Sequence, residues 1–142
     1  MKADNFSVAD SVAIEYEGCY FDLHNNYDFT GLTYEVNSQR VILEWSKGES
    51  EWAEKEIYSS LKLVFDFVSI FNVTSRISGQ PFSADDCLSY MGYLHPDDID
   101  LMDGFLPREN ADESYHLVFG FEGGQVVKLY AETVKLLTTL EG

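Results

Sequence analysis

The first half of the chain alternates apolar and polar residues with a period of two, which is typical of half-buried β-strands. Residues 12–17 and 19–23 follow this pattern, and Gly18 between them predicts a tight turn or a bulge. Residues 32–36 and 41–45 repeat the pattern on either side of a short turn, which predicts a β-hairpin.

A further strand-like segment, residues 57–77, is rich in β-branched and aromatic residues. Its apolar phase changes after Asp66 and Phe67, which predicts either a bulge in one long strand or a corner between two strands. The polar stretch 46–56, which precedes it, predicts an exposed loop with at most one helical turn around Trp52.

The third quarter of the chain changes to helical spacing. After Ser83, a candidate N-cap, apolar residues recur at Leu88, Met91 and Leu94. Pro96 would end this helix and begin a second one. The sequence therefore predicts one or two helices at this point.

Strands return near the end of the chain. Residues 116–121 and 127–131 flank the two-glycine segment 122–125, which predicts a second hairpin. Val134 and Leu137 favour a short closing helix, although a final strand fits them nearly as well.

This order of elements predicts an α+β fold, not a parallel one. We expect a mainly antiparallel sheet of about seven strands, a sandwich or a strongly curved sheet, with one or two helices inserted before the final hairpin. The 142 residues fit a single domain, residues 1–142. Apolar residues make up 45% of the chain and aromatic residues 15%, which is enough for a core without metal or disulfide.

The chain is strongly acidic, with nine Lys plus Arg against 25 Asp plus Glu and a formal net charge of −16. Binding to nucleic acid requires a basic face, so this charge argues against nucleic acid and anionic membranes as partners. No segment resembles a signal peptide or reaches the ~20 apolar residues of a membrane span, so a cytoplasmic location is predicted.

The acidic residues concentrate in the segment 83–113, which has nine of them against Arg108 alone. Such a surface could dock a basic partner protein, or its acids could simply favour helix starts and remain solvated. The candidate partner-binding acids are Asp97, Asp98, Asp100, Asp103 and Glu109. Trp52 is a further candidate, because a tryptophan in a charged segment either anchors a partner or holds its own loop on the sheet.

The sequence contains no metal or cofactor motif. His95 lies near three of the candidate aspartates, Asp97, Asp98 and Asp100, but the spacing matches no ligand template. Helix capping accounts for these aspartates, so we predict no metal and no cofactor.

Catalytic motifs are also absent from the sequence. Cys19 and Cys87 both have apolar neighbours, which predicts buried thiols. A nucleophilic site would need one of them beside a histidine; His24 lies across a strand from Cys19, and His116 is predicted to be exposed. These observations predict a protein that is not an enzyme.

One resemblance rests on the segments 27–32 (YDFTGL) and 61–68 (LxLxFxxV), with two strands and a charged loop between them. Over roughly residues 27–75 the chain resembles small uncharacterised bacterial domains, some of which belong to polymorphic-toxin systems as immunity proteins. The resemblance implies a protein that binds and blocks one toxin, without catalysis and without a cofactor.

We therefore predict a non-catalytic protein-binding module, an immunity-type inhibitor that engages a basic partner through an acidic surface. Two other classes stay open: a structural subunit of a homo-oligomer, and a small-ligand-binding protein or enzyme with an unrecognised pocket.

Overall fold

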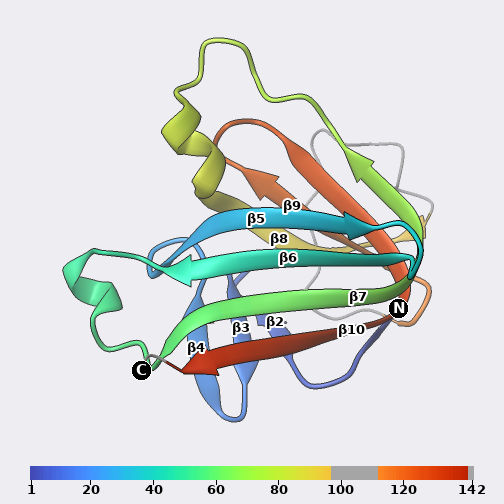
Figure 1. Ribbon diagram of the computed structural model, residues 1–142, viewed down its shortest axis with the longest axis horizontal. Coiled ribbons are helices and arrows are strands. Elements are labelled where there is room, and N and C mark those ends of the chain that lie inside the picture. Colours follow the sequence, from blue (N-terminus) through green and yellow to red (C-terminus); the bar gives the residue numbers. More distant parts are fainter. Residues whose placement is uncertain (97–111, 141–142) are drawn as a thin grey trace.

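The computed structural model describes residues 1–96 and 112–140, whose regular secondary structure is almost entirely β (Figure 1). The strands are β1 Lys2–Ala3, β2 Ser7–Ala9, β3 Ala13–Tyr16, β4 Cys19–Asp22, β5 Tyr27–Glu35, β6 Arg40–Lys47, β7 Tyr58–Val73, β8 Leu88–Leu94, β9 His116–Phe121 and β10 Val126–Leu140. Two short 3₁₀ helices occur in the described residues, η1 at Glu51–Ala53 and η2 at Phe82–Asp86. In this part of the chain no helix has the length and apolar character needed to cross a membrane.

The described strands form one large and one small sheet. In the large sheet the antiparallel order is β5-β6-β7-β10-β9-β8, and the short β1 pairs in parallel with β10. The small sheet has the order β2-β3-β4. Figure 1 shows that the large sheet curls strongly, so that β8 and β9 lie behind β5. The predicted antiparallel, strongly curved sheet is confirmed.

The core fills the inside of this curl. Leu61, Leu63 and Phe65 are fully buried, as their alternation predicts. The small sheet adds Phe21, whose ring lies 5.5 Å from that of Tyr58 on β7. The small sheet therefore packs on the inner face of the large one and completes the same core.

Aromatic contacts bring the two ends of the large sheet together. Phe29 on β5 lies 4.7 Å from Phe121 on β9, ring centroid to ring centroid, and 5.1 Å from Trp45 on β6. The helix η2 contacts both β5 and β9. We call this meeting of β5 with β8 and β9, beneath η2, the seam.

The long strand β7 bends at the position where the apolar phase changes. Phe67 has φ = 57°, in the left-handed region that non-glycine residues rarely adopt. Next to it the pairing with β10 shifts, because Tyr130 pairs with Ile70 and Ala131 with Val68. The predicted bulge in one strand is thus confirmed over the alternative of two strands joined by a corner.

The helix predicted after Ser83 is wrong, because residues 88–94 form strand β8. A bulge between Leu88 and Tyr90 allows Leu88 and Met91, three residues apart, to pair with the two inward residues Phe121 and Phe119. Residues 91–94 are all buried, so the strand lacks the alternation of a half-buried strand. The spacing of apolar residues in such a segment does not distinguish a strand from a helix.

The outcome for the other predicted helices changes the fold class from the one predicted. A closing helix at Val134 and Leu137 is wrong, because β10 continues to Leu140 and pairs with β7 along nearly its whole length. The second helix, predicted from Pro96, lies in residues 97–111, outside the described residues. The described chain is therefore a β-protein and not α+β.

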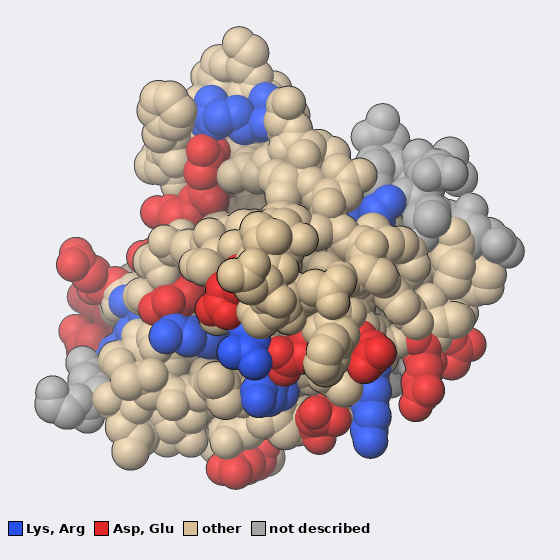
Figure 2. Space-filling view, turned by 45° about the vertical axis from the view of Figure 1, so that its right-hand side comes forward, with Lys and Arg blue, Asp and Glu red and all other residues tan. Residues whose placement is uncertain are grey.

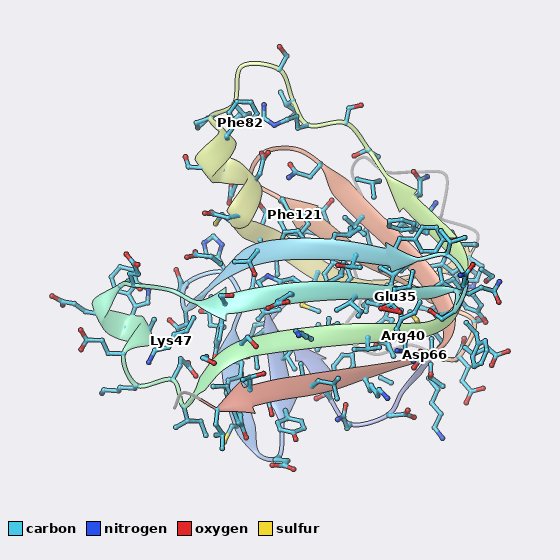
Figure 3. The ribbon with its side chains drawn as sticks, viewed as in Figure 1. Glu35, Arg40, Lys47, Asp66, Phe82 and Phe121 are labelled. Atoms are coloured by element: carbon cyan, nitrogen blue, oxygen red, sulfur yellow. The ribbon has the colours of Figure 1, made fainter. Side chains whose placement is uncertain are left out.

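The segment 74–87 forms an arm that leaves β7 and returns to β8 at the top of Figure 1. Arg76 holds it together: its guanidinium lies 3.0 Å from Asp85 and 4.6 Å from the ring centre of Phe82. The amide of Ile77 donates to the carbonyl of Gly123 in the β9–β10 turn at 2.8 Å. These contacts fix the end of the arm over the seam, and Figure 3 labels Phe82 above Phe121.

Candidate functional site

Trp52 stands in the loop between β6 and β7, residues 48–57, which we call the Trp52 loop. Its neighbour Ala53 is fully buried and anchors the single turn of η1. The Trp52 indole Nε1–H donates to the carbonyl of Asn25 at 2.6 Å, while 63% of the residue stays exposed. The tryptophan is therefore fixed in orientation and still offers most of its ring to solvent.

The Trp52 loop is acidic. It contains four glutamates and one lysine, and the three glutamates nearest the indole in sequence, Glu49, Glu51 and Glu54, are all exposed. Lys47, just before the loop, donates to the carbonyl of Glu54 at 3.3 Å. In Figure 2 acidic atoms gather at the left-hand end of the molecule, where η1 lies in Figure 1.

Ion pairs join neighbouring strands of the large sheet. Arg40 on β6 contacts Asp66 on β7 at 2.8 Å, and Lys62 lies 3.8 Å from Glu44. Figure 3 labels Arg40 and Asp66 next to each other. The Asp66 carboxylate raises the pKa of Arg40, both by hydrogen bonding and by its charge. Surface pairs of this kind contribute little to stability.

A second group of polar side chains converges at the seam. His24 follows β4, Cys87 joins η2 to β8, and Glu122 begins the β9–β10 turn. One ligand-type atom from each of the three lies within 4.8 Å of the others. His24 and Cys87 are half-buried and Glu122 is exposed, so the group opens to solvent on one side.

Hydrogen bonds position this group. The Nδ1 atom of His24 lies 2.6 Å from the carbonyl oxygen of Leu88 and 3.5 Å from Sγ of Cys87. Because a carbonyl only accepts, Nδ1 carries the proton and donates it to Leu88. The backbone amide of Glu122 donates to the carbonyl of Cys87 at 2.9 Å, which ties the turn to the arm.

The carboxylates near the thiol oppose its ionisation. Burial raises the pKa of Cys87, and the negative charges of Glu122, Asp86 and Asp28 raise it further. Burial also raises the pKa of Asp86, together with the charges of Asp28 and Asp85. Cys87 is therefore a protonated thiol at neutral pH, the less nucleophilic form.

The Cys87–His24 pair lacks the arrangement of a nucleophile and its base. A general base must accept the thiol proton, but the nitrogen that faces Cys87 already donates its own proton to Leu88. This geometry does not activate the thiol.

The structure describes only one of the predicted partner-binding residues, Trp52. The five predicted acids Asp97, Asp98, Asp100, Asp103 and Glu109 lie outside the described residues, and the first three of them are the aspartates near His95. The ring of His95 packs edge-on against Tyr115 at 5.2 Å.

Two predictions of burial are wrong. Cys19, predicted to be buried, is exposed, since it sits at the turn of the two-stranded β3–β4 unit. His116, predicted to be exposed, is 5% exposed, because the neighbouring ring of Tyr130 covers it at 5.0 Å.

Sequence reasoning did not find the group at the seam. Cys87 and His24 are 63 positions apart, and no spacing rule joins residues so distant. The available signal was the residue types alone, a histidine, a cysteine and a glutamate, and the sequence pattern places Cys87 in the helix predicted after Ser83.

A scan against protein-family models and searches of curated proteins and of solved structures each found no match. The fold thus defines a class, a curled antiparallel β-sheet closed by a small second sheet, and the function has to be argued from the surface.

Proposed function

We propose that this protein is a non-catalytic binding module that engages a basic protein partner through the Trp52 loop. The observation that supports the proposal best is Trp52 itself, 63% exposed and fixed by its hydrogen bond to Asn25. Large aromatic side chains of this kind, together with arginine, supply most of the energy of protein interfaces.

The fixed orientation of the indole favours binding. A side chain that is already ordered loses less conformational entropy when a partner covers it. The exposed ring faces keep their apolar surface available, while the polar N–H group is already satisfied within the protein.

The charge around Trp52 favours a basic partner. The exposed carboxylates Glu49, Glu51 and Glu54 surround the indole in sequence, and the whole chain carries a net charge of −16. Such a field attracts basic proteins and repels acidic ones, which raises the association rate of the former.

A narrower form of the proposal makes the partner a toxin and the protein its inhibitor. It rests on the resemblance of residues 27–75 to immunity-type domains. The acids Asp97, Asp98, Asp100, Asp103 and Glu109 would extend the binding surface, and this extension is a prediction from sequence alone.

The test is affinity capture from a lysate of the source organism with the tagged wild-type protein and two matched variants, Trp52→Ala and Phe82→Ala. Both variants remove an exposed aromatic ring, and Phe82 on the arm is 80% exposed. We expect a basic protein to be retained by the wild type and by Phe82→Ala, and to be lost from Trp52→Ala. With the purified partner, Trp52→Ala should weaken binding by about 2 kcal/mol or more, roughly 30-fold.

Charge variants separate a local surface from the overall field. Glu51→Gln with Glu54→Gln removes two charges beside Trp52, and Glu15→Gln with Glu132→Gln removes two exposed charges elsewhere. The first pair should lower the association rate and its salt dependence more than the second. Equal effects of the two pairs, or a partner that Trp52→Ala retains fully, would remove the Trp52 loop from the binding surface.

A further inference from the structure

The group at the seam has the composition of a transition-metal site. His24 offers an imidazole nitrogen, Cys87 a sulfur and Glu122 a carboxylate oxygen, which are the three donor types that zinc uses in proteins. Three protein ligands with one open position are also a recognised zinc arrangement. The exposed Glu122 lies on the solvent side, where an ion could enter.

The distances are close to those that a metal requires. In a tetrahedral zinc site, bond lengths of about 2.3 Å to sulfur and about 2.0 Å to nitrogen place these two ligand atoms about 3.5 Å apart. The observed separation between Sγ of Cys87 and Nδ1 of His24 is 3.5 Å. All three ligand atoms lie within 4.8 Å, so movements of about 1 Å would bring them to bonding distance.

The backbone holds the ring of His24 in place. Its Nδ1–H donates to the carbonyl of Leu88, which places the lone pair of the neutral ring on Nε2. Since Nδ1 is the nitrogen that lies 3.5 Å from Sγ of Cys87, it is the atom that would bind the ion, in the other neutral tautomer, with the proton on Nε2 and the hydrogen bond to Leu88 given up.

Negative charge surrounds the position. Besides Glu122, the carboxylates of Asp28 and Asp86 are close enough to act electrostatically on Cys87. The nearest arginine of the arm, Arg76, is engaged by Asp85. The site therefore concentrates like charges that a divalent cation would neutralise.

We propose that His24, Cys87 and Glu122 bind one divalent transition-metal ion, zinc in the first place. The thiol would lose its proton to solvent and bind as the thiolate. The three ligands come from the β4–β5 connection, the end of the arm and the β9–β10 turn. The ion would therefore cross-link the two ends of the curled sheet at the seam.

The test uses zinc and cobalt salts with the purified, metal-free full chain. Zinc should bind with a stoichiometry of one and raise the melting temperature, because it binds the folded protein and joins segments that separate on unfolding. Cobalt should give the near-ultraviolet band of a cobalt–thiolate bond. That band reports coordination by the cysteine and not mere adhesion of the ion to surface carboxylates.

Matched cysteine variants decide between this site and other metal binding. Cys19→Ser removes the other, exposed thiol and should keep both the cobalt band and the melting shift. Cys87→Ser should lose the band and weaken zinc binding by at least about tenfold. Mutation of a group that only supports a metal ligand already weakens binding by about tenfold, and loss of a ligand should cost no less.

Glu122→Gln is a second test in case Cys87→Ser does not fold. Glu122 is exposed and lies outside the core, so its replacement should not disturb folding. This variant should also weaken zinc binding by about tenfold or more. A wild-type protein without a cobalt–thiolate band would overturn the proposal, as would zinc affinity that is unchanged in both Cys87→Ser and Glu122→Gln.

Discussion

At the scale of single residues, the packing around a side chain sets its chemistry, and His116 is the clearest case. It is 5% exposed, and its Nδ1 has no hydrogen-bond partner among the described residues. Burial lowers the pKa of His116, and the positive charges of the equally buried Lys128 and of the N-terminal amine lower it further.

This shift predicts a loss of stability in acid. The pKa of His116 in the folded protein is below its ordinary value of about 6.5. Below about pH 6.5 the unfolded chain therefore binds a proton at this residue more readily than the folded chain does. The free energy of unfolding should therefore fall as the pH drops below about 6.5, by at most about 1.4 kcal/mol per pH unit from this group. Urea unfolding at pH 8 and at pH 5.5 measures the change.

The variant His116→Phe isolates this contribution, because it keeps an aromatic ring against Tyr130 and cannot titrate. Its stability should fall less than that of the wild type between the two pH values. If both proteins lose the same stability, His116 is not the group responsible.

At the scale of elements, the bend of β7 lets one strand serve two parts of the curled sheet. Up to Phe65 it pairs with β6 and β10, and beyond the bulge its partner is β10 alone. The amide of Val68 points away from β10 and donates to the carbonyl of Gln39, just before β6, at 2.8 Å. The bend depends on Phe67, whose positive φ is unfavourable for a residue with a side chain.

This conformation predicts an unusual order of stability at position 67. Phe67→Gly should be more stable than Phe67→Ala by about 0.5–1 kcal/mol, because glycine adopts positive φ without steric cost. Both variants remove the same exposed ring, so their difference reports the backbone alone. Urea unfolding of the two variants measures it.

Asn72 provides the control, since it is exposed on the same strand and is not among the residues with positive φ. There Asn72→Gly should be less stable than Asn72→Ala by about 0.5–1 kcal/mol. The same order at both positions would contradict a strained bend at Phe67.

At the scale of the whole molecule, the closure of the curled sheet determines which distant segments lie next to each other. The contact of Phe29 with Phe121 joins β5 to β9, although three strands lie between them in the order of the sheet. This closure brings the β4–β5 connection to the arm, and so it assembles the group of His24, Cys87 and Glu122.

Removing the ring that spans the seam should destabilise the whole domain. Phe29→Ala loses its contacts with Phe121 and Trp45 and leaves a cavity, with an expected cost of about 2–4 kcal/mol. Phe82→Ala removes an 80% exposed residue's ring and its contact with Arg76, and should lower stability by no more than about 1 kcal/mol. Thermal and urea unfolding measure both, and similar losses for the two variants would show that the seam contact does not support the fold.

The sequence predicted the candidate site only in part. Trp52 could be singled out because a tryptophan among glutamates is locally unusual, and the structure shows that it is exposed. The burial of His116 depends on Tyr130, a residue on another strand, and the neighbourhood of Cys87 depends on two further segments. Local pattern carries no information about such contacts.

The sequence by itself determined the antiparallel strands of the first half, both hairpins, the bulge near Phe67 and the strong negative charge. These features depend on neighbours within a few residues, which period-two alternation and turn residues record directly. Only the tertiary structure decided that residues 88–94 form a strand, since their burial on both faces comes from distant partners. It also decided the closure of the sheet and the convergence at the seam, because contacts between residues far apart in the chain depend on how the whole sheet curls and not on any local spacing.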